Sequence, residues 1–254
     1  MHTVAALIFS MVVFVGVGCS GSTDGGGSGG DGGTPGTGGV AGTRGVGGIG
    51  GSGGLGGSGT KCTTATVFPN GVAAGDVDQS SVVLWARADF AGTVRFEYGT
   101  DPSFDQIDGS IDVMVAVDGE ETIPSKAEIT ELLDGTQYYY RACRGSCPSA
   151  VGQECEARGS FRTPHAMERH GLRFGVSSCF EGKMRPFVSI KNIPSRDLDF
   201  FVALGDTVYA DGNGSLDEFR KTHNAASSQV FSPDDNMLAR ARASTAFFAT
   251  IDDH

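Results

Sequence analysis

The alternation of apolar and polar positions is regular between Val67 and Thr163. Over short runs every second residue is apolar, as at Val94, Phe96 and Tyr98, and Asp-Pro or Asp-Gly pairs such as Asp118-Gly119 separate the runs. A period of two with frequent turn signals is typical of half-buried strands. We therefore expect about seven short strands in a β-sandwich of the immunoglobulin or fibronectin III type. Trp85 is expected to lie in its core.

A different pattern begins after His165. Three apolar segments are expected to be strands, and they cover Arg173–Ser178, Asp199–Leu204 and Phe247–Ile251. The middle segment is apolar without alternation, which predicts a strand covered by helices on both faces. Segments with helical features separate the strands, so the pattern indicates βαβ units of a mostly parallel sheet.

Helix signals support this interpretation. Residues Lys183–Asn192 have helical spacing, with Pro186 in the first turn. A capping box, Ser215-Leu216-Asp217-Glu218, predicts a helix that runs to about Ala226. Ser232-Pro233-Asp234 predicts the start of a third helix, which carries Met237 and Leu238.

Glycine divides the chain into regions. Of its 40 glycines, 22 lie between Ser20 and Thr60, where large apolar residues are almost absent. Such a stretch cannot bury enough surface to form a core. We expect residues 20–61 to be a flexible tether, residues 62–165 to be the sandwich and residues 166–254 to be the α/β region.

The first residues resemble an export signal. An apolar core from Val4 to Val17 is too short for a comfortable membrane span and ends in small residues. Residues 1–19 are thus expected to direct export. Val17-Gly18-Cys19 resembles a bacterial lipoprotein cleavage site, with a lipid on Cys19; the alternative is that Cys19 is an ordinary residue of the signal. We expect the protein in the periplasm or at the cell surface, lipid-anchored.

Four cysteines lie in the sandwich region, at positions 62, 143, 147 and 155. In an oxidising compartment an even set of cysteines suggests two disulfides. Three connectivities are possible among Cys62, Cys143, Cys147 and Cys155. A zinc site is a competing interpretation, disfavoured because Cys143 and Cys147 have no second close pair. Cys179 lies outside this set, in the α/β region, and is expected to have another role.

The net charge of the chain limits the classes of binding partner that can be expected. The chain has a formal net charge of −11, and the excess is concentrated in residues 62–165, with 16 acidic against 7 basic side chains. No basic stripe is present, so a general surface for the nucleic-acid backbone is not expected. The acidity is compatible with metal cations. His165, His170 and His223 are expected to be surface or linker residues.

Chemistry-bearing residues follow each expected strand. They are Cys179, then Asp206 with Tyr209, then Asp253 with His254. Parallel strands place their carboxyl ends on one edge of a sheet, where these groups would converge. Thiolate, carboxylate and phenolate ligands suggest a divalent or trivalent metal, with iron favoured. The alternative is that Asp206 only caps a turn and Tyr209 is packing.

Six segments carry a family resemblance: FPNGVAAGDVDQSSVVLWAR, ELLDGTQYYYR, LRFGVSSC, LDFFVALGDTVYADG, LDEFRKTH and FFATIDDH. They resemble the alkaline phosphatase D (PhoD-like) family of metallophosphoesterases. The resemblance implies a fibronectin III-like β-sandwich followed by an α/β metallophosphoesterase-type domain. It also implies Fe(III) and Ca(II), with metal ligands at Cys179, Asp206, Tyr209 and Asp253, and with His254 near the scissile phosphate.

The function implied is that of an exported, monomeric, metal-dependent phosphoesterase acting on phosphate monoesters and diesters. Members of the family continue well beyond the matched segments, so we expect a truncated catalytic domain that is inactive alone. The alternative is a surface lipoprotein whose sandwich binds a wall or carbohydrate partner, with a decayed phosphatase remnant.

Overall fold

The computed structural model describes residues 67–119, 121–147, 156–167, 171–212, 214–226 and 237–252. These residues belong to one structural unit. The expected export signal, Cys19, the tether, Cys62, Cys155 and the Ser232-Pro233-Asp234 helix start lie outside them. Among the described helices, none has the length and apolar character needed to cross a membrane.

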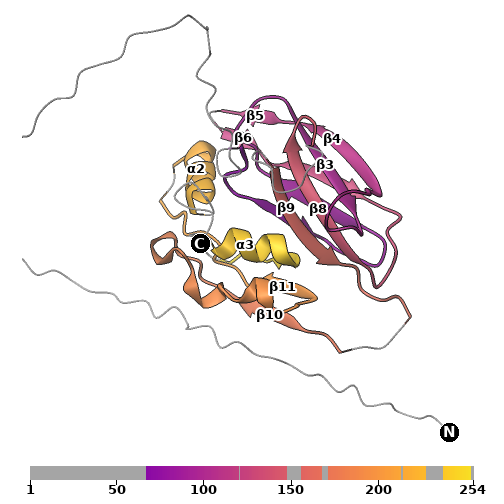
Figure 1. The fold of residues 1–254 in the computed structure, drawn as a ribbon. Coiled ribbons are helices and arrows are strands. Elements are labelled where there is room, and N and C mark those ends of the chain that lie inside the picture. Colours follow the sequence, from indigo (N-terminus) through magenta and orange to yellow (C-terminus); the bar gives the residue numbers. More distant parts are fainter. Residues whose placement is uncertain are drawn as a thin grey trace, which may run out of the picture. The chain divides into compact units, whose positions relative to one another are not determined.

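Two sheets built from residues 72–162 face each other across a hydrophobic core (Figure 1). Three strands belong to the first sheet: β1 (Val72–Gly75), β2 (Val82–Ala86) and β7 (Ser125–Ile129). Four form the second: β4 (Gly109–Met114), β3 (Thr93–Gly99), β8 (Gln137–Arg144) and β9 (Glu156–Arg162). A two-stranded ribbon adds β5 (Ala116–Asp118) and β6 (Glu121–Ile123). The described chain is thus mostly β-sheet, as the alternating pattern predicts.

Strand β2 shows how the alternation builds the core. Leu84 is fully buried between the sheets, whereas its neighbour Trp85 is on the opposite face and only half-buried. The expectation that Trp85 lies in the core is wrong. Because successive side chains of a strand point to opposite faces, a buried Leu84 places Trp85 outside the sandwich.

The sandwich contains a disulfide between Cys143 and Cys147, whose Cα atoms are 5.2 Å apart. Cys143 is the penultimate residue of β8 and Cys147 lies three residues after the strand, so the bond closes the turn that leaves it. This bond excludes the two connectivities in which Cys143 and Cys147 pair with Cys62 and Cys155.

Strands from the second half of the chain extend the first sheet. They are β10 (Phe174–Ser177), β11 (Phe200–Ala203) and β12 (Ala246–Ala249). The three pair in parallel, and β12 also pairs in parallel with β1, which gives a six-stranded order of β10-β11-β12-β1-β2-β7. Ala246 is the joint, because it is in register with both Phe200 and Ala74. The strands before and after residue 165 therefore share one sheet.

The expected helix at Lys183–Asn192 is not formed. The segment instead makes three 3-10 turns: η1 (Gly182–Met184), η2 (Val188–Ile190) and η3 (Ile193–Ser195). Phe187 has a left-handed φ of 59°, and Pro186 before it cannot donate a backbone hydrogen bond. A left-handed residue in mid-segment ends any α-helical hydrogen-bond series, so spacing alone was misleading.

The helix that the capping box predicts is formed, and of the two bonds of the box the one from Glu218 to Ser215 is present. Helix α2 spans Leu216–Ala226, and the backbone N–H of Glu218 donates to Oγ of Ser215 at 3.2 Å. The Glu218 carboxylate turns back and accepts from the N–H of Gly214 at 2.7 Å. Helix α3 spans Met237–Ser244 and lies beside β9 and β11 (Figure 1).

One face of β11 is buried and the other is not. Phe201 and Ala203 pack with Leu238 of α3 and Phe187 of the 3-10 segment. Phe200 and Val202, on the opposite face, are half-buried and line a cavity of about 380 Å³. The expectation that helices cover both faces is wrong for the described residues.

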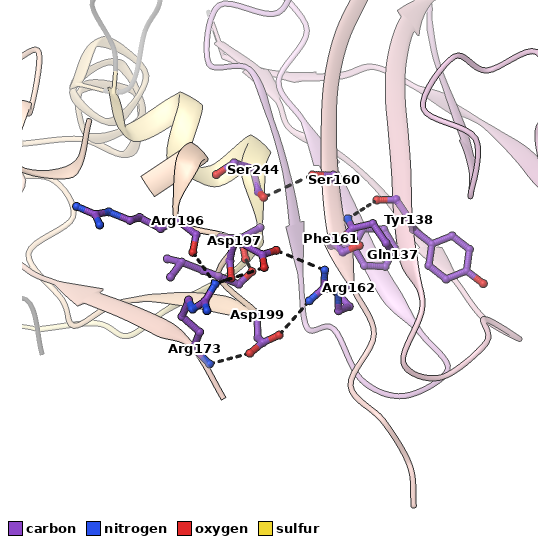
Figure 2. A network of polar contacts seen from close by, with 12 residues as sticks. Gln137, Tyr138, Ser160, Phe161, Arg162, Arg173, Arg196, Asp197, Asp199 and Ser244 are labelled. Carbon is purple, nitrogen blue, oxygen red and sulfur yellow. Dashed lines mark hydrogen bonds and ion pairs between the residues drawn. The ribbon is translucent and has the colours of Figure 1, made fainter. Parts of the chain in front are cut away.

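A polar network joins β9 to the turn before β11 (Figure 2). Arg162 of β9 contacts Asp197 at 3.4 Å and Asp199 at 3.6 Å. Asp199 also accepts from the backbone N–H of Arg173 at 2.7 Å. These contacts hold the start of the parallel strands against the edge of the sandwich, so the opposite, carboxyl ends are positioned by the same frame.

Candidate functional site at the strand ends

The carboxyl ends of β10, β11 and β12 lie side by side. Pairing continues past the strands, since Leu204 donates to Ser177 at 2.8 Å and Thr250 donates to Ala203 at 2.9 Å. The N–H of Phe180 then donates to the carbonyl of Asp206 at 2.8 Å, which ties the loop after β10 to the loop after β11. The convergence expected at this edge is therefore seen for the first two strands.

The backbone turns sharply where these loops begin. Gly205 has a φ of 85°, Asp206 of 47° and Cys179 of 61°, all in the left-handed region. This conformation is uncommon for residues other than glycine and costs free energy. Two such residues at adjoining loops are therefore held there by their surroundings, a pattern that clusters at functional sites.

Asp206 is the centre of the site. It is 8 % exposed, and its Oδ2 accepts a hydrogen bond from the phenol of Tyr209 at 3.1 Å. Its other oxygen, Oδ1, is buried with no hydrogen-bond partner among the described residues. A buried carboxylate oxygen without a donor is costly unless a cation or a water satisfies it.

Cys179 lies against the same carboxylate, with its sulfur 3.8 Å from Oδ2 of Asp206. Cys179 is disulfide-bonded, so this contact is not a hydrogen bond: a disulfide sulfur has no proton to donate. The expectation that Cys179 is spared from disulfide formation is wrong. The position of the residue beside Asp206 follows from the strand order, but its oxidation state depends on tertiary proximity that spacing does not show.

Asp252 lies beside the loop that begins at Gly205, and the sequence-based prediction did not include it. A Cβ added to Gly205 would lie 2.4 Å from Cβ of Asp252, so glycine at 205 is what lets the Asp252 side chain approach this loop. The segment IDDH at residues 251–254 contains Asp252, but the sequence-based prediction chose Asp253 and His254. Asp253 and His254 lie outside the described residues.

The donor set can be compared with what a cation requires. No cluster of three or more His, Cys, Asp or Glu side chains suitable for a metal occurs among the described residues. The partnerless Oδ1 of Asp206 and the adjacent phenol of Tyr209 do fit a hard cation, which prefers oxygen ligands. Cys179 fits only after reduction, because the thiolate is the metal-binding form.

A second cavity adjoins this edge. It has a volume of about 420 Å³, and its lining includes Thr207 and Val208, which directly follow Asp206. His223 of α2 also lines it. Burial, followed by the charge of Arg242, lowers the pKa of His223 below its ordinary value of 6.5. The expectation that His223 is a surface or linker residue is wrong, because the residue lies on the inner side of α2.

Comparison with known proteins adds the family. Residues 56–165 match the model described as "PhoD-like phosphatase, N-terminal domain". This region is a PhoD-like phosphatase N-terminal region. A solved structure called "Structure of PhoD" superposes with a TM-score of 0.61 at 24% identity, and the match covers 74% of this chain and 39% of that chain. At that identity the likeness shows the fold. The chain spans 39% of the length of that PhoD chain.

Other solved structures are less similar. A glycosyl hydrolase family 2 member from Bacteroides cellulosilyticus matches with a TM-score of 0.29 and 9% identity, over 74% of this chain and 30% of that one. A redesigned β-sandwich protein matches with a TM-score of 0.28 and 12% identity, over 39% of this chain and 96% of that one. These scores are too low to support an argument about fold. No curated protein sequence matches this chain.

Proposed function

We propose that the protein is an exported, metal-dependent phosphoesterase of the PhoD-like type that cleaves phosphate monoesters and diesters. One observation carries the proposal: at the carboxyl end of a parallel strand, Asp206 has one oxygen bonded to Tyr209 and the other buried without a partner among the described residues. The PhoD-like N-terminal region that precedes it supplies the reaction class.

The ligands follow from the donor atoms. Asp206 and Tyr209 would hold the metal, with Fe(III) and Ca(II) proposed from the family resemblance. Asp253 is proposed as a further ligand on the same basis, and Cys179 as a ligand in its reduced form. Such cations lower the pKa of a bound water and neutralise charge on a phosphoryl group.

The chain's own residues would orient the metal-binding carboxylate and protonate the leaving oxygen. Asp206 is held by the turn at Gly205 and by the hydrogen bond from Tyr209, so its carboxylate is oriented before any cation binds. Burial of Asp206 excludes competing water from the carboxylate. His254 is proposed to bind the phosphate or to protonate the leaving oxygen.

Several wider features belong to the same proposal. They are the fibronectin III-like character of the sandwich, an α/β metallophosphoesterase-type fold for the second region, the export signal, the lipid anchor on Cys19 and a monomeric state. The chain spans 39% of the PhoD chain. The activity of that whole protein is therefore a proposal for this chain. Asp206 and Tyr209 alone make a partial ligand shell, so we expect little or no activity from the chain by itself.

Metal binding and hydrolysis together test the proposal. The full chain would be dialysed against Fe(III) and Ca(II), and its metal content and cleavage of a nitrophenyl phosphodiester and monoester measured with and without chelator. We expect binding that Asp206→Asn abolishes and that Glu128→Gln, an exposed change on β7, leaves intact. Cleavage that survives both chelator and Asp206→Asn would contradict the proposal. An iron-free protein that binds cell-surface polymer would favour the binding-module alternative.

A further inference from the structure

The cavity of about 420 Å³ beside Thr207 and Val208 has a charged and aromatic wall. Trp85 of β2, Lys126 of β7 and Arg242 of α3 contribute side chains to its lining. Trp85 and Lys126 are directly paired across the two strands and so project from the same face of the sheet. The volume falls within the range of sites for small ligands.

Arg242 is the group that needs a partner. One guanidinium nitrogen donates to the carbonyl of Asn70 at 2.9 Å, and the guanidinium carbon lies 5.2 Å from the centre of the Trp85 ring. Its Nε is buried with no hydrogen-bond partner among the described residues. Burial lowers the pKa of Arg242 to about 10, so the group is still a cation near neutral pH. Arg242 is half-buried, and a cation partly withdrawn from water without a carboxylate is held at a cost in free energy.

The charges around the cavity favour an anion. Its lining contains two cations, Lys126 and Arg242, against one carboxylate, Asp76. Burial, followed by the charge of Arg242, lowers the pKa of His223, which disfavours its cationic form. No carboxylate forms an ion pair with Arg242 in the part of the chain that the structure describes, so its charge is available to a ligand.

From these observations we propose that the cavity binds a phosphate group, held by the guanidinium of Arg242 against the ring of Trp85. Arginine presents donors in a fork that matches two phosphate oxygens, and these charge-assisted bonds are stronger than neutral ones. Lys126, an exposed residue of the lining, adds a second cation. Thr207, the residue after Asp206, lines the cavity. Because the cavity therefore lies next to the proposed metal site, its role would be to hold a second anionic group of the substrate. This role, but not the anion binding itself, rests on the proposed function.

Trp85 makes the test direct, because it is the chain's single tryptophan. The full chain would be titrated with inorganic phosphate in the presence of chelator, and the fluorescence of Trp85 followed, with sodium chloride at equal ionic strength as the salt control. We expect a saturable change that chloride does not produce. Arg242→Lys retains the charge but loses the fork, so its affinity should fall by about tenfold. Lys126→Gln should weaken binding by a few-fold, and Lys183→Gln, an exposed change elsewhere, should leave it unchanged.

The outcomes separate this inference from the proposed function. Asp206→Asn should bind phosphate as the unaltered chain does, even though it loses metal binding. If Arg242→Lys fails to fold, as circular dichroism would show, Lys126→Gln decides. Phosphate binding that is absent, or that is equal in the unaltered chain, Lys126→Gln and Arg242→Lys, overturns the inference whatever the metal assays show.

Discussion

The phenol of Tyr209 donates a hydrogen bond of 3.1 Å to Oδ2 of Asp206, and Oδ1 of the same carboxylate has no partner among the described residues. One oxygen of the carboxylate is thus fixed by a hydrogen bond, and the other is the atom at which we propose that a cation binds. A group positioned in this way is held at some cost to the metal-free protein, which is common for functional residues.

This cost gives a first prediction. Asparagine keeps an acceptor for Tyr209, tolerates the left-handed φ of 47° at position 206 and removes the buried charge. Asp206→Asn should therefore stabilise the metal-free chain by about 1 kcal/mol, whereas Asp206→Ala should destabilise it. Urea unfolding in chelator measures both. Equal destabilisation by the two variants would show that Oδ1 is satisfied in solution.

The close approach of Asp252 to Gly205 gives a second prediction. Gly205→Ala combines an unfavourable φ of 85° with a contact of 2.4 Å to Cβ of Asp252. It should cost roughly 2 kcal/mol or more. Gly212 is a matched control, because its φ is 81° but an added Cβ would meet nothing within 4 Å. Gly212→Ala should cost only about 1 kcal/mol. Similar losses for both in chemical denaturation would refute the proposed contact.

The two faces of β11 give a third prediction. Phe201 is 1 % exposed and stacks on Phe247 at 5.6 Å between ring centres, whereas Phe200 is half-buried. Phe201→Ala should cost about 3–5 kcal/mol. Phe200→Ala should cost roughly half of that or less, because less apolar surface returns to water. The free energies of unfolding test the comparison, and a larger loss for Phe200→Ala would mean that its face is covered in solution.

His223 gives a prediction about pH. Burial and the charge of Arg242 lower its pKa in the folded state below 6.5, so the unfolded chain binds the proton more readily. The contribution of His223 to stability is therefore fully present at a pH above its ordinary pKa of 6.5, and it is lost as the pH falls through the lower pKa of the folded state. His223→Gln should remove this part of the acid sensitivity. Unfolding midpoints measured across this range would contradict the account if the variant and the unaltered chain lose stability in parallel.

Local signals in the sequence predicted local structure well. The helix signal at Ser215–Glu218 depends only on neighbours in the chain, and the helix forms with the expected bond from the N–H of Glu218 to Ser215. The parallel arrangement of β10, β11 and β12 was also expected from the pattern, and with it the meeting of Cys179 and Asp206 at one edge. Each of these needs only the identity of nearby residues or the general rule that parallel strands end at one edge.

Features that depend on distant contacts were not predictable. The pairing of Ala246 with both Ala74 and Phe200 joins segments far apart in the chain, and no period reveals it. The disulfide state of Cys179 also depends on tertiary proximity. Likewise Arg242 and Trp85 come together only because α3 packs against β1, so neither residue carried a local sign of a ligand site.

The central claim is that Tyr209 and Asp206 together hold a cation at the strand ends. The most direct measurement is visible absorption of the full chain, loaded with Fe(III) after its disulfides have been reduced and the reductant removed, since a phenolate ligand of Fe(III) gives a charge-transfer band. The account predicts a coloured protein that becomes colourless in Tyr209→Phe and in Asp206→Asn and that keeps its colour in Tyr139→Phe. Absence of the band from the unaltered chain, or its persistence in Tyr209→Phe, would contradict the claim.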